Sequence, residues 1–237
     1  MWILAHRGAS KAAPENTLKA FKLAFEQHAH GIEFDTYELD SEIIVFHDKT
    51  LRRTTNGKGR LLDKSLSYLR GLNAGDNQQI PLLCEVLTLA PASALCNIEI
   101  KHLQATNTWL QKLESVWPAV NQPNNNLLIS SFHHHWLAQI AQQKPNLRIG
   151  VLTASMPQEG ITKAVKMQAY SIHFALENID ERYVVQAKEA GLKVLVYTVD
   201  TPADMLKLQK MGVDGIFTNV PDVAKSTLNA LPTATTS

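Results

Sequence analysis

Residues 32–46 read IEFDTYELDSEIIVF and contain two β-type runs, at 32–39 and 43–46. Only Asp40, Ser41 and Glu42 separate the two runs. A crossover between parallel strands needs a dozen or more residues, whereas antiparallel strands can be joined by a tight turn. We therefore predict that the two runs form an antiparallel hairpin, in which the second run is a return strand and not a member of a parallel sheet.

Short β-rich runs recur along the chain and alternate with stretches of helical periodicity. The runs are Trp2–Ala5, Ile32–Leu39, Ile43–Phe46, Leu95–Ile100, Leu127–Ser130, Arg148–Leu152, Ala169–Phe174, Lys193–Val199 and Gly215–Thr218. Apolar residues follow helical spacing at Thr17–Gln27 and Ala203–Met211. Repeated strand–helix–strand units indicate a parallel sheet. Without the return strand of the hairpin, the runs have the strand number of a closed TIM-type (β/α)₈ barrel. An open doubly wound sheet is the alternative.

The length of 237 residues suits a single barrel domain at 1–237, since such barrels typically have about 250 residues. Between Asp48 and Pro81 turn formers are frequent and the helical pattern is weak. This pattern predicts a small insertion over one barrel end at about residues 49–80. The polar tail at about residues 230–237 is expected to be frayed.

Composition and charge exclude several classes of protein. Hydrophobic residues make up 45% and charged residues 19% of the chain, which excludes a disordered or coiled-coil protein. A formal net charge of +1 gives no general attraction to nucleic acid or to a membrane. The apolar start is too short for a signal peptide or a membrane span, and Cys84 and Cys96 fit buried free thiols. We expect a cytoplasmic protein that binds a small molecule, with neither nucleic acid nor membrane insertion.

Several ionisable side chains lie in or at the ends of otherwise aliphatic strands. His6 follows the first run, and Glu33 and Asp35 share one face of the second because side chains alternate along a strand. Glu99 and Lys101 repeat that arrangement on a later run. In barrel enzymes the C-terminal ends of the strands converge on one mouth. The three carboxylates are therefore expected to share a small volume.

The hairpin also predicts a position for His47. A turn centred near Ser41 places His47 opposite Asp35, with Cα or Cβ atoms roughly 4.5–5.5 Å apart. A register that differed by one residue would send His47 to the opposite face.

Three carboxylates in a small volume repel one another unless positive charge compensates them. A hard divalent cation takes oxygen ligands, so we predict one Mg²⁺ or Ca²⁺ held by Glu33, Asp35 and Glu99. Zinc is disfavoured because no pair of His or Cys residues with zinc-type spacing lies near these acids. The alternative is that the carboxylates form buried ion pairs with Arg7 and Lys101.

Two histidines beside such a metal suit a phosphodiester substrate. Arg7 and Lys101 can bind phosphoryl oxygens, and imidazoles transfer protons near neutral pH. Of His6 and His47, one would deprotonate the attacking hydroxyl and the other would protonate the leaving alkoxide.

The motifs that carry these residues occur in a fixed order along the chain. They are His6-Arg7-Gly8, Pro14-Glu15-Asn16-Thr17, Glu33-Phe34-Asp35, His47-Asp48 and Asn97-Ile98-Glu99-Ile100-Lys101, followed by Tyr197-Thr198-Val199-Asp200 and Gly212-Val213-Asp214-Gly215-Ile216-Phe217-Thr218-Asn219. This pattern resembles the glycerophosphodiester phosphodiesterase family almost from end to end, and is most similar to short cytosolic bacterial members linked to glycerophosphodiester uptake.

The resemblance implies a TIM-type barrel that hydrolyses substrates such as glycerophosphocholine or glycerophosphoethanolamine to sn-glycerol 3-phosphate and an alcohol. It implies a metal at Glu33, Asp35 and Glu99. It also implies that His6 and His47 are the general base and the general acid, and that Arg7 and Lys101 bind the phosphate. The neighbouring glycerol hydroxyl would be the internal nucleophile, giving a cyclic phosphate that water then opens.

Two other functions remain open at this point. One is a phospholipase-C-like enzyme that stops at a cyclic phosphate, and the other is an inactive barrel that only binds phosphodiesters. The run His133-His134-His135 is interpreted as a polar helix start, since consecutive residues point in different directions. His173 is as compatible with filling the barrel as with lining a pocket.

Overall fold

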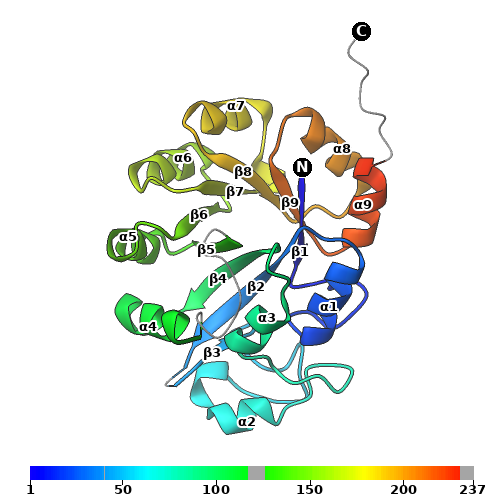
Figure 1. The fold of residues 1–237 in the computed structure, drawn as a ribbon, viewed down its shortest axis with the longest axis vertical. Coiled ribbons are helices and arrows are strands. Elements are labelled where there is room, and N and C mark those ends of the chain that lie inside the picture. The colour runs from blue at the N-terminus through cyan, green and yellow to red at the C-terminus, as the bar shows by residue number, and fades with distance from the viewer. Residues whose placement is uncertain (40, 117–125, 230–237) are drawn as a thin grey trace.

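The computed structural model describes residues 1–39, 41–116 and 126–229, and its parallel strands close into a barrel (Figure 1). The strands are β1 (Trp2–His6), β2 (Gly31–Glu38), β3 (Ile43–Val45), β4 (Leu95–His102), β5 (Leu127–Ser131), β6 (Arg148–Thr153), β7 (Ser171–Ala175), β8 (Lys193–Tyr197) and β9 (Gly215–Thr218). Strand β1 pairs in parallel with both β2 and β9. This second pairing closes the barrel, so the TIM-type prediction is confirmed and the open sheet is excluded.

Helices follow the barrel strands and form the outer layer, as Figure 1 shows for α4 to α7. The helices are α1 (Leu18–Glu26), α2 (Leu66–Arg70), α3 (Leu83–Leu89), α4 (Thr106–Val116), α5 (His134–Gln143), α6 (Pro157–Lys166), α7 (Glu181–Glu189), α8 (Pro202–Lys210) and α9 (Pro221–Asn229), with short 3₁₀ turns η1 (Leu61–Asp63) and η4 (Leu176–Asn178). Both sequence-predicted helices are present as α1 and α8. Thr17 caps α1 by accepting a hydrogen bond from the Ala20 amide.

The predicted hairpin is present, but its register differs by one residue from the prediction. Thr36 pairs with Val45, and the Leu39 amide donates to the Glu42 carbonyl at 2.8 Å. The centre of pairing therefore lies between residues 40 and 41 and not at Ser41, so the predicted pairing of His47 with Asp35 is wrong. The Phe46 amide occupies that place and donates to the Asp35 carbonyl at 2.9 Å.

Strand β2 is longer than β1, and β3 pairs with the part that β1 does not reach. Residues 31–33 of β2 pair with β1, whereas residues 36–38 pair with β3. The hairpin thus extends beyond the barrel end at which β1 stops.

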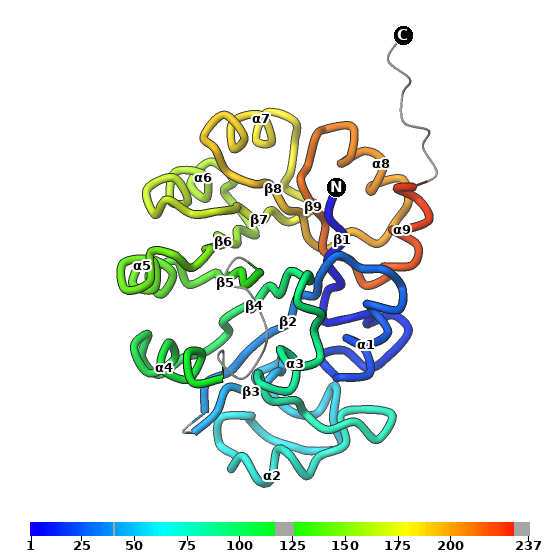
Figure 2. Tube along the Cα trace, viewed as in Figure 1, coloured from blue at the N-terminus to red at the C-terminus, as the bar shows by residue number. Residues whose placement is uncertain are grey.

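Residues 49–80 lie between β3 and α3 and cover this extension, as the cyan segment of Figure 2 shows. The segment forms a second hydrophobic cluster with the hairpin, made of Tyr37, Leu39, Ile44, Phe46, Leu51, Leu61, Leu69, Leu72, Ala74 and Ile80. Arg70 links the segment to the start of α3 by hydrogen bonds. Its guanidinium donates to both Glu85 carboxylate oxygens and to the Ile80 carbonyl. The predicted frayed tail lies outside the described residues.

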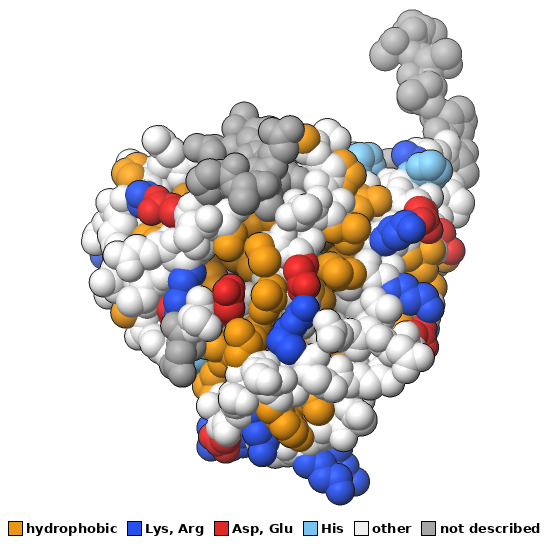
Figure 3. All heavy atoms as spheres, turned by 60° about the horizontal axis from the view of Figure 1, so that its bottom comes forward, with side chains coloured by type: hydrophobic (Ala, Val, Ile, Leu, Met, Phe, Trp, Pro, Cys, Tyr) orange, Lys and Arg blue, Asp and Glu red, His pale blue; other side chains and the backbone are white. Residues whose placement is uncertain are grey.

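Figure 3 shows one face on which hydrophobic side chains gather, with isolated acidic and basic side chains among them. Within the described part of the chain, every helix is too short or too polar to cross a bilayer.

Candidate active site

The sequence-predicted site residues come together in a pocket of about 280 Å³ at the C-terminal ends of the barrel strands. Six of the seven line this pocket: His6, Arg7, Glu33, His47, Glu99 and Lys101. The seventh, Asp35, is fully buried and contacts both cations, with its Oδ2 3.2 Å from Arg7 Nε and its Oδ1 3.1 Å from Lys101 Nζ.

Strand register explains why residues far apart in the sequence meet here. His6 on β1 lies beside Glu33 on β2, and Asp35 lies beside Glu99 on β4. One oxygen from each carboxylate lies within 4.8 Å of the others. The expectation that the three acids share a small volume is confirmed.

Two cations partly compensate the three carboxylates. Lys101 Nζ lies 2.5 Å from Glu99 Oε1 in addition to its contact with Asp35. The ion pairs that the sequence offered as an alternative to a metal are therefore present. However, two cations against three carboxylates leave one negative charge without compensation when all three acids are ionised.

The pKa values of the acids reflect this imbalance. Burial, together with the charges of Asp35 and Glu99, raises the pKa of Glu33 well above its usual value. Burial and the charge of Asp35 raise the pKa of Glu99 to about 7. Burial acts in the same direction on Asp35, but Lys101 and Arg7 outweigh it and hold the pKa of Asp35 below its usual value.

The donor set fits a hard divalent cation. Buried Glu33 Oε1 has no hydrogen-bond partner in the described part of the chain, while its Oε2 accepts a hydrogen bond from the Arg7 backbone amide at 3.1 Å. A cation at this cluster would supply the missing positive charge, and carboxylate oxygens are the ligands that Mg²⁺ and Ca²⁺ prefer.

His6 is held by a hydrogen-bond chain from the last strands of the barrel. Its Nδ1 lies 2.8 Å from Asn219 Oδ1, and Asn219 Nδ2 donates to Asp200 Oδ2 at 2.6 Å. This second bond fixes the amide orientation, so the oxygen of Asn219 faces His6 and can only accept. His6 must then carry its proton on Nδ1, which leaves Nε2 unprotonated, 3.9 Å from Glu33 Oε2. Burial, and after it the charge of Arg7, lowers the pKa of His6 to about 4.

His47 lies two residues beyond β3, where the chain leaves the sheet, and this is how it reaches the pocket despite the shifted register. Its Nδ1 lies 2.6 Å from Asp48 Oδ1, and its carbonyl accepts a hydrogen bond from the Tyr37 hydroxyl at 3.1 Å. A carboxylate can only accept, so His47 also has its proton on Nδ1 and directs Nε2 away from Asp48.

Arg53, from the segment at 49–80, connects the surroundings of both histidines. Its guanidinium donates to Asp48 and to Glu15, with distances of 2.6–2.8 Å to the oxygens of both carboxylates. Glu15 in turn accepts a hydrogen bond from Arg7 at 2.9 Å. The hydrogen bonds from Arg53 are the main reason that the pKa of Asp48 is held well below its usual value.

Sequence reasoning gave no role to Arg53, Asp200 or Asn219. Asp200 and Asn219 belong to the motifs that carry the resemblance, and each closely follows a barrel strand, just as His6 is the last residue of one. Because the C-terminal ends of the strands converge on the mouth of the barrel, both residues could have been predicted to lie at the site. Arg53 lies among turn formers, where no such rule applies.

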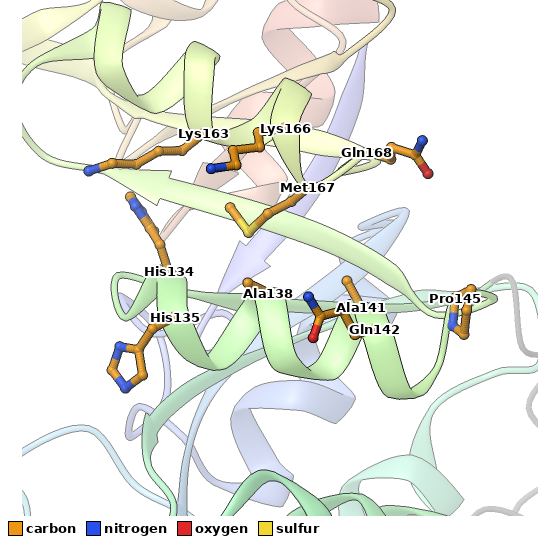
Figure 4. Close-up of a pocket in the computed structure, with 10 residues that line it drawn as sticks. All are labelled: His134, His135, Ala138, Ala141, Gln142, Pro145, Lys163, Lys166, Met167 and Gln168. Carbon is orange, nitrogen blue, oxygen red and sulfur yellow. The ribbon is translucent and has the colours of Figure 1, made fainter.

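A larger hollow of about 550 Å³ lies elsewhere, between α5 and α6 (Figure 4). The described residues that line it are small or apolar ones, two glutamines, and Lys163, Lys166, His134 and His135, and none of them carries a carboxylate. His133 precedes α5 and His134 begins it, so the interpretation of the three histidines as a helix start is confirmed. This hollow lacks the combination of acids and bases found at the barrel mouth.

Two imidazoles, two cations and an acidic cluster at the mouth of a closed barrel define a TIM-barrel phosphodiesterase. Residues 6–223 match the model of the glycerophosphoryl diester phosphodiesterase family, and the chain belongs to that family.

Curated proteins and solved structures agree with this assignment. The chain is 38% identical over 231 residues to a glycerophosphodiester phosphodiesterase of Caldanaerobacter subterraneus, covering 93% of this chain and 94% of the relative. It is 32% identical to a glycerophosphodiester phosphodiesterase of Bacillus altitudinis, covering 94% and 96% of the two chains. An Oleispira antarctica phosphodiesterase, solved in complex with the product sn-glycerol-3-phosphate, superposes with a TM-score of 0.89 at 28% identity, covering 97% of each chain.

Replacing Asn219 with Ala removes the acceptor that orients His6. We expect kcat to fall about tenfold or more with a smaller change in KM, because an imidazole without its hydrogen-bonded partner loses both its orientation and its fixed tautomer. Steady-state kinetics would measure this, with Asn107→Ala on the exposed surface of α4 as the matched control. Equal kinetics for the two variants would remove Asn219 from the site.

The raised pKa of Glu99 predicts how the stability of the metal-free protein depends on pH. Between pH 4.5 and about 7 folded Glu99 retains a proton that the unfolded chain has already released. The free energy of unfolding therefore falls across this window as pH rises, by on the order of 2–3 kcal/mol from this group. Urea unfolding in EDTA at pH 5 and pH 7.5 would measure the fall, and Glu99→Gln should reduce it. Parallel pH dependence of the two proteins would contradict this prediction.

Proposed function

We propose that the protein hydrolyses glycerophosphodiesters to sn-glycerol 3-phosphate and an alcohol. The observation that carries this proposal is the pair of imidazoles: His6 and His47 each have Nδ1 bound to an acceptor and Nε2 available, and both line one pocket with Arg7 and Lys101. The substrate class is supported by the names of the relatives and by the sn-glycerol-3-phosphate found in the Oleispira structure.

His6 is the general base of this proposal. A pKa of about 4 keeps its Nε2 unprotonated at neutral pH, so Nε2 can take the proton of the attacking hydroxyl. That hydroxyl is the glycerol hydroxyl next to the phosphate ester, and its oxygen forms the new P–O bond. The Nε2 atom of the imidazolium that results lies 3.9 Å from Glu33 Oε2.

His47 is the general acid. It donates a proton from Nε2 to the alcohol oxygen as the P–O bond to that oxygen breaks, while Asp48 stabilises the imidazolium through Nδ1. In the second step, water adds to the cyclic phosphate and gives its proton to His47, and protonated His6 returns its proton to the glycerol oxygen that leaves. Both histidines thereby regain their starting protonation states.

Glu33, Asp35 and Glu99 are the proposed ligands of one divalent cation, Mg²⁺ or Ca²⁺. When bound, the cation neutralises negative charge that develops on the phosphoryl oxygens. Arg7 and Lys101 lie at the same cluster, where each can turn from Asp35 toward a phosphoryl oxygen.

A reducing, cytoplasmic compartment and a small-molecule substrate complete the proposal. The support for the compartment is that Cys84 and Cys96 are free thiols, and that Cys96 is buried.

The direct test is release of sn-glycerol 3-phosphate from glycerophosphoethanolamine and glycerophosphocholine. We expect activity to disappear after chelation with EDTA and to return with Mg²⁺ or Ca²⁺, because the acidic cluster needs compensation before it can accept a phosphate. A coupled enzymatic assay measures the product. Cyclic phosphate as the only product would favour the phospholipase-C-like reaction, and binding without turnover would favour the inactive barrel.

Single substitutions test the two histidines. His6→Ala and His47→Ala should each lower kcat by about 10²-fold or more with the fold retained, the usual loss when a general acid or base is removed. His135→Ala, which removes an exposed imidazole on α5, is the matched control and should keep its activity. Turnover close to wild type in either test variant would exclude that histidine from the reaction.

A further inference from the structure

Below the charged groups, the floor of the active-site pocket holds two neutral polar side chains, Asn97 and His173. Both line the pocket and both are buried, with exposures of 1% and 0%. The wall beside them is apolar and includes Leu152 and Phe217. Neither polar residue takes part in the proton transfers or ion pairs described above.

His173 is a neutral imidazole whose Nδ1 has no hydrogen-bond partner among the residues that the structure describes. Its Nε2 lies 2.8 Å from the Ser171 hydroxyl, and its ring centre lies 5.1 Å from that of Phe217. Burial lowers the pKa of His173 to about 3, so the ring carries no charge at neutral pH. The Ser171 hydroxyl can either donate or accept, and His173 Nδ1 can therefore accept or donate in turn.

Asn97 supplies a second free polar atom at the same floor. Its Nδ2 donates to the Ser130 hydroxyl at 3.0 Å, whereas within the described ranges its Oδ1 has no hydrogen-bond partner. The amide orientation set by Ser130 leaves this oxygen as an acceptor.

Placing the His173 imidazole inside the barrel requires a special backbone position and leaves a buried polar atom without a partner among the described residues. A Cβ atom at Gly150 would lie 2.5 Å from His173 Nε2, so a glycine is required there to make room for the ring. An unpaired buried polar atom destabilises the fold, because it has lost its hydrogen bonds to water without gaining a partner, whereas a leucine or phenylalanine at position 173 would fill the space without that penalty. The pair of free atoms is therefore better explained by a ligand than by packing.

The chemistry of the floor suits an uncharged hydroxyl group. A hydroxyl both donates and accepts, which matches an imidazole nitrogen of either type and an amide oxygen on residues that line the same pocket. The phosphate carries the negative charge of the substrate and has its partners in Arg7 and Lys101, at the charged end of the pocket. The remaining polar group on the glycerol unit is its terminal hydroxyl.

We propose that His173 and Asn97 bind the terminal hydroxyl of the glycerol unit and so determine the preference of the enzyme for glycerol over diols that lack this group. The inference rests on the proposed function and adds the residues that recognise the glycerol half of the substrate.

The test compares two substrates that differ only in that hydroxyl. One is glycerophosphoethanolamine, and the other is its analogue in which hydrogen replaces the terminal hydroxyl, leaving the hydroxyl next to the phosphate ester in place. The wild-type enzyme should prefer the first by about tenfold or more in kcat/KM, since a site built to hydrogen-bond a hydroxyl discriminates against its absence. His173→Leu should reduce this ratio to a value of about 1–3, because kcat/KM for the first substrate falls.

Two further variants separate recognition from packing. His173→Asn retains a polar group close to the position of Nδ1 and should recover part of the preference. Leu152→Val alters the same wall without removing a polar atom, since Leu152 lies beside His173 in the register of β6 and β7, and should leave the ratio as in the wild type.

Each outcome gives a decision. A lowered ratio in His173→Leu with recovery in His173→Asn supports the inference. Equal losses on both substrates would show that His173 only packs or holds a water molecule. Equal use of the two substrates by the wild-type enzyme would overturn the inference while the proposed function stands, and hydrolysis of neither substrate would overturn both.

Discussion

Three carboxylates are buried against two cations at the mouth of the barrel, and the rest of the active site is arranged around this incomplete neutralisation. Asp35 holds both Arg7 and Lys101, and it alone of the three acids keeps a lowered pKa. The negative charge that the two cations do not compensate is reflected in the raised pKa values of Glu33 and Glu99. The three acids can all be ionised only when further positive charge is added. Such a cluster is suited to bind a divalent cation and, through it, an anionic substrate.

The same electrostatic setting distinguishes two histidines that are chemically identical. His6 is bound to a neutral amide, and burial lowers its pKa. His47 is hydrogen-bonded to the Asp48 carboxylate instead, and its side chain is only partly buried. The two imidazoles thus differ in the group that their Nδ1 atoms contact, which suits the two different roles proposed for them.

Strand alternation and strand-end convergence made most of the fold and the charged site predictable from the sequence. The nine β-runs, the hairpin and the closed barrel were predicted correctly, because each depends on local pattern or on connection length. The register of the hairpin was not predicted correctly. A turn centred on Ser41 and one centred between residues 40 and 41 differ only in the backbone hydrogen bonds at the turn, which the sequence pattern does not show. The link between His6 and Asn219 spans 213 residues of sequence, so only the closed barrel reveals it.

The contacts of Arg53 have a consequence for how the molecule loses activity. Residues 49–80 pack on the hairpin extension and have a hydrophobic cluster of their own, whereas the barrel closes without them. Yet Arg53 bonds to the carboxylates that hold His47 and Arg7. Local opening of this segment, at a lower free energy than global unfolding, would remove the hydrogen bonds from Arg53 and so abolish activity while the barrel stayed folded. The segment is peripheral to the architecture and central to the enzyme.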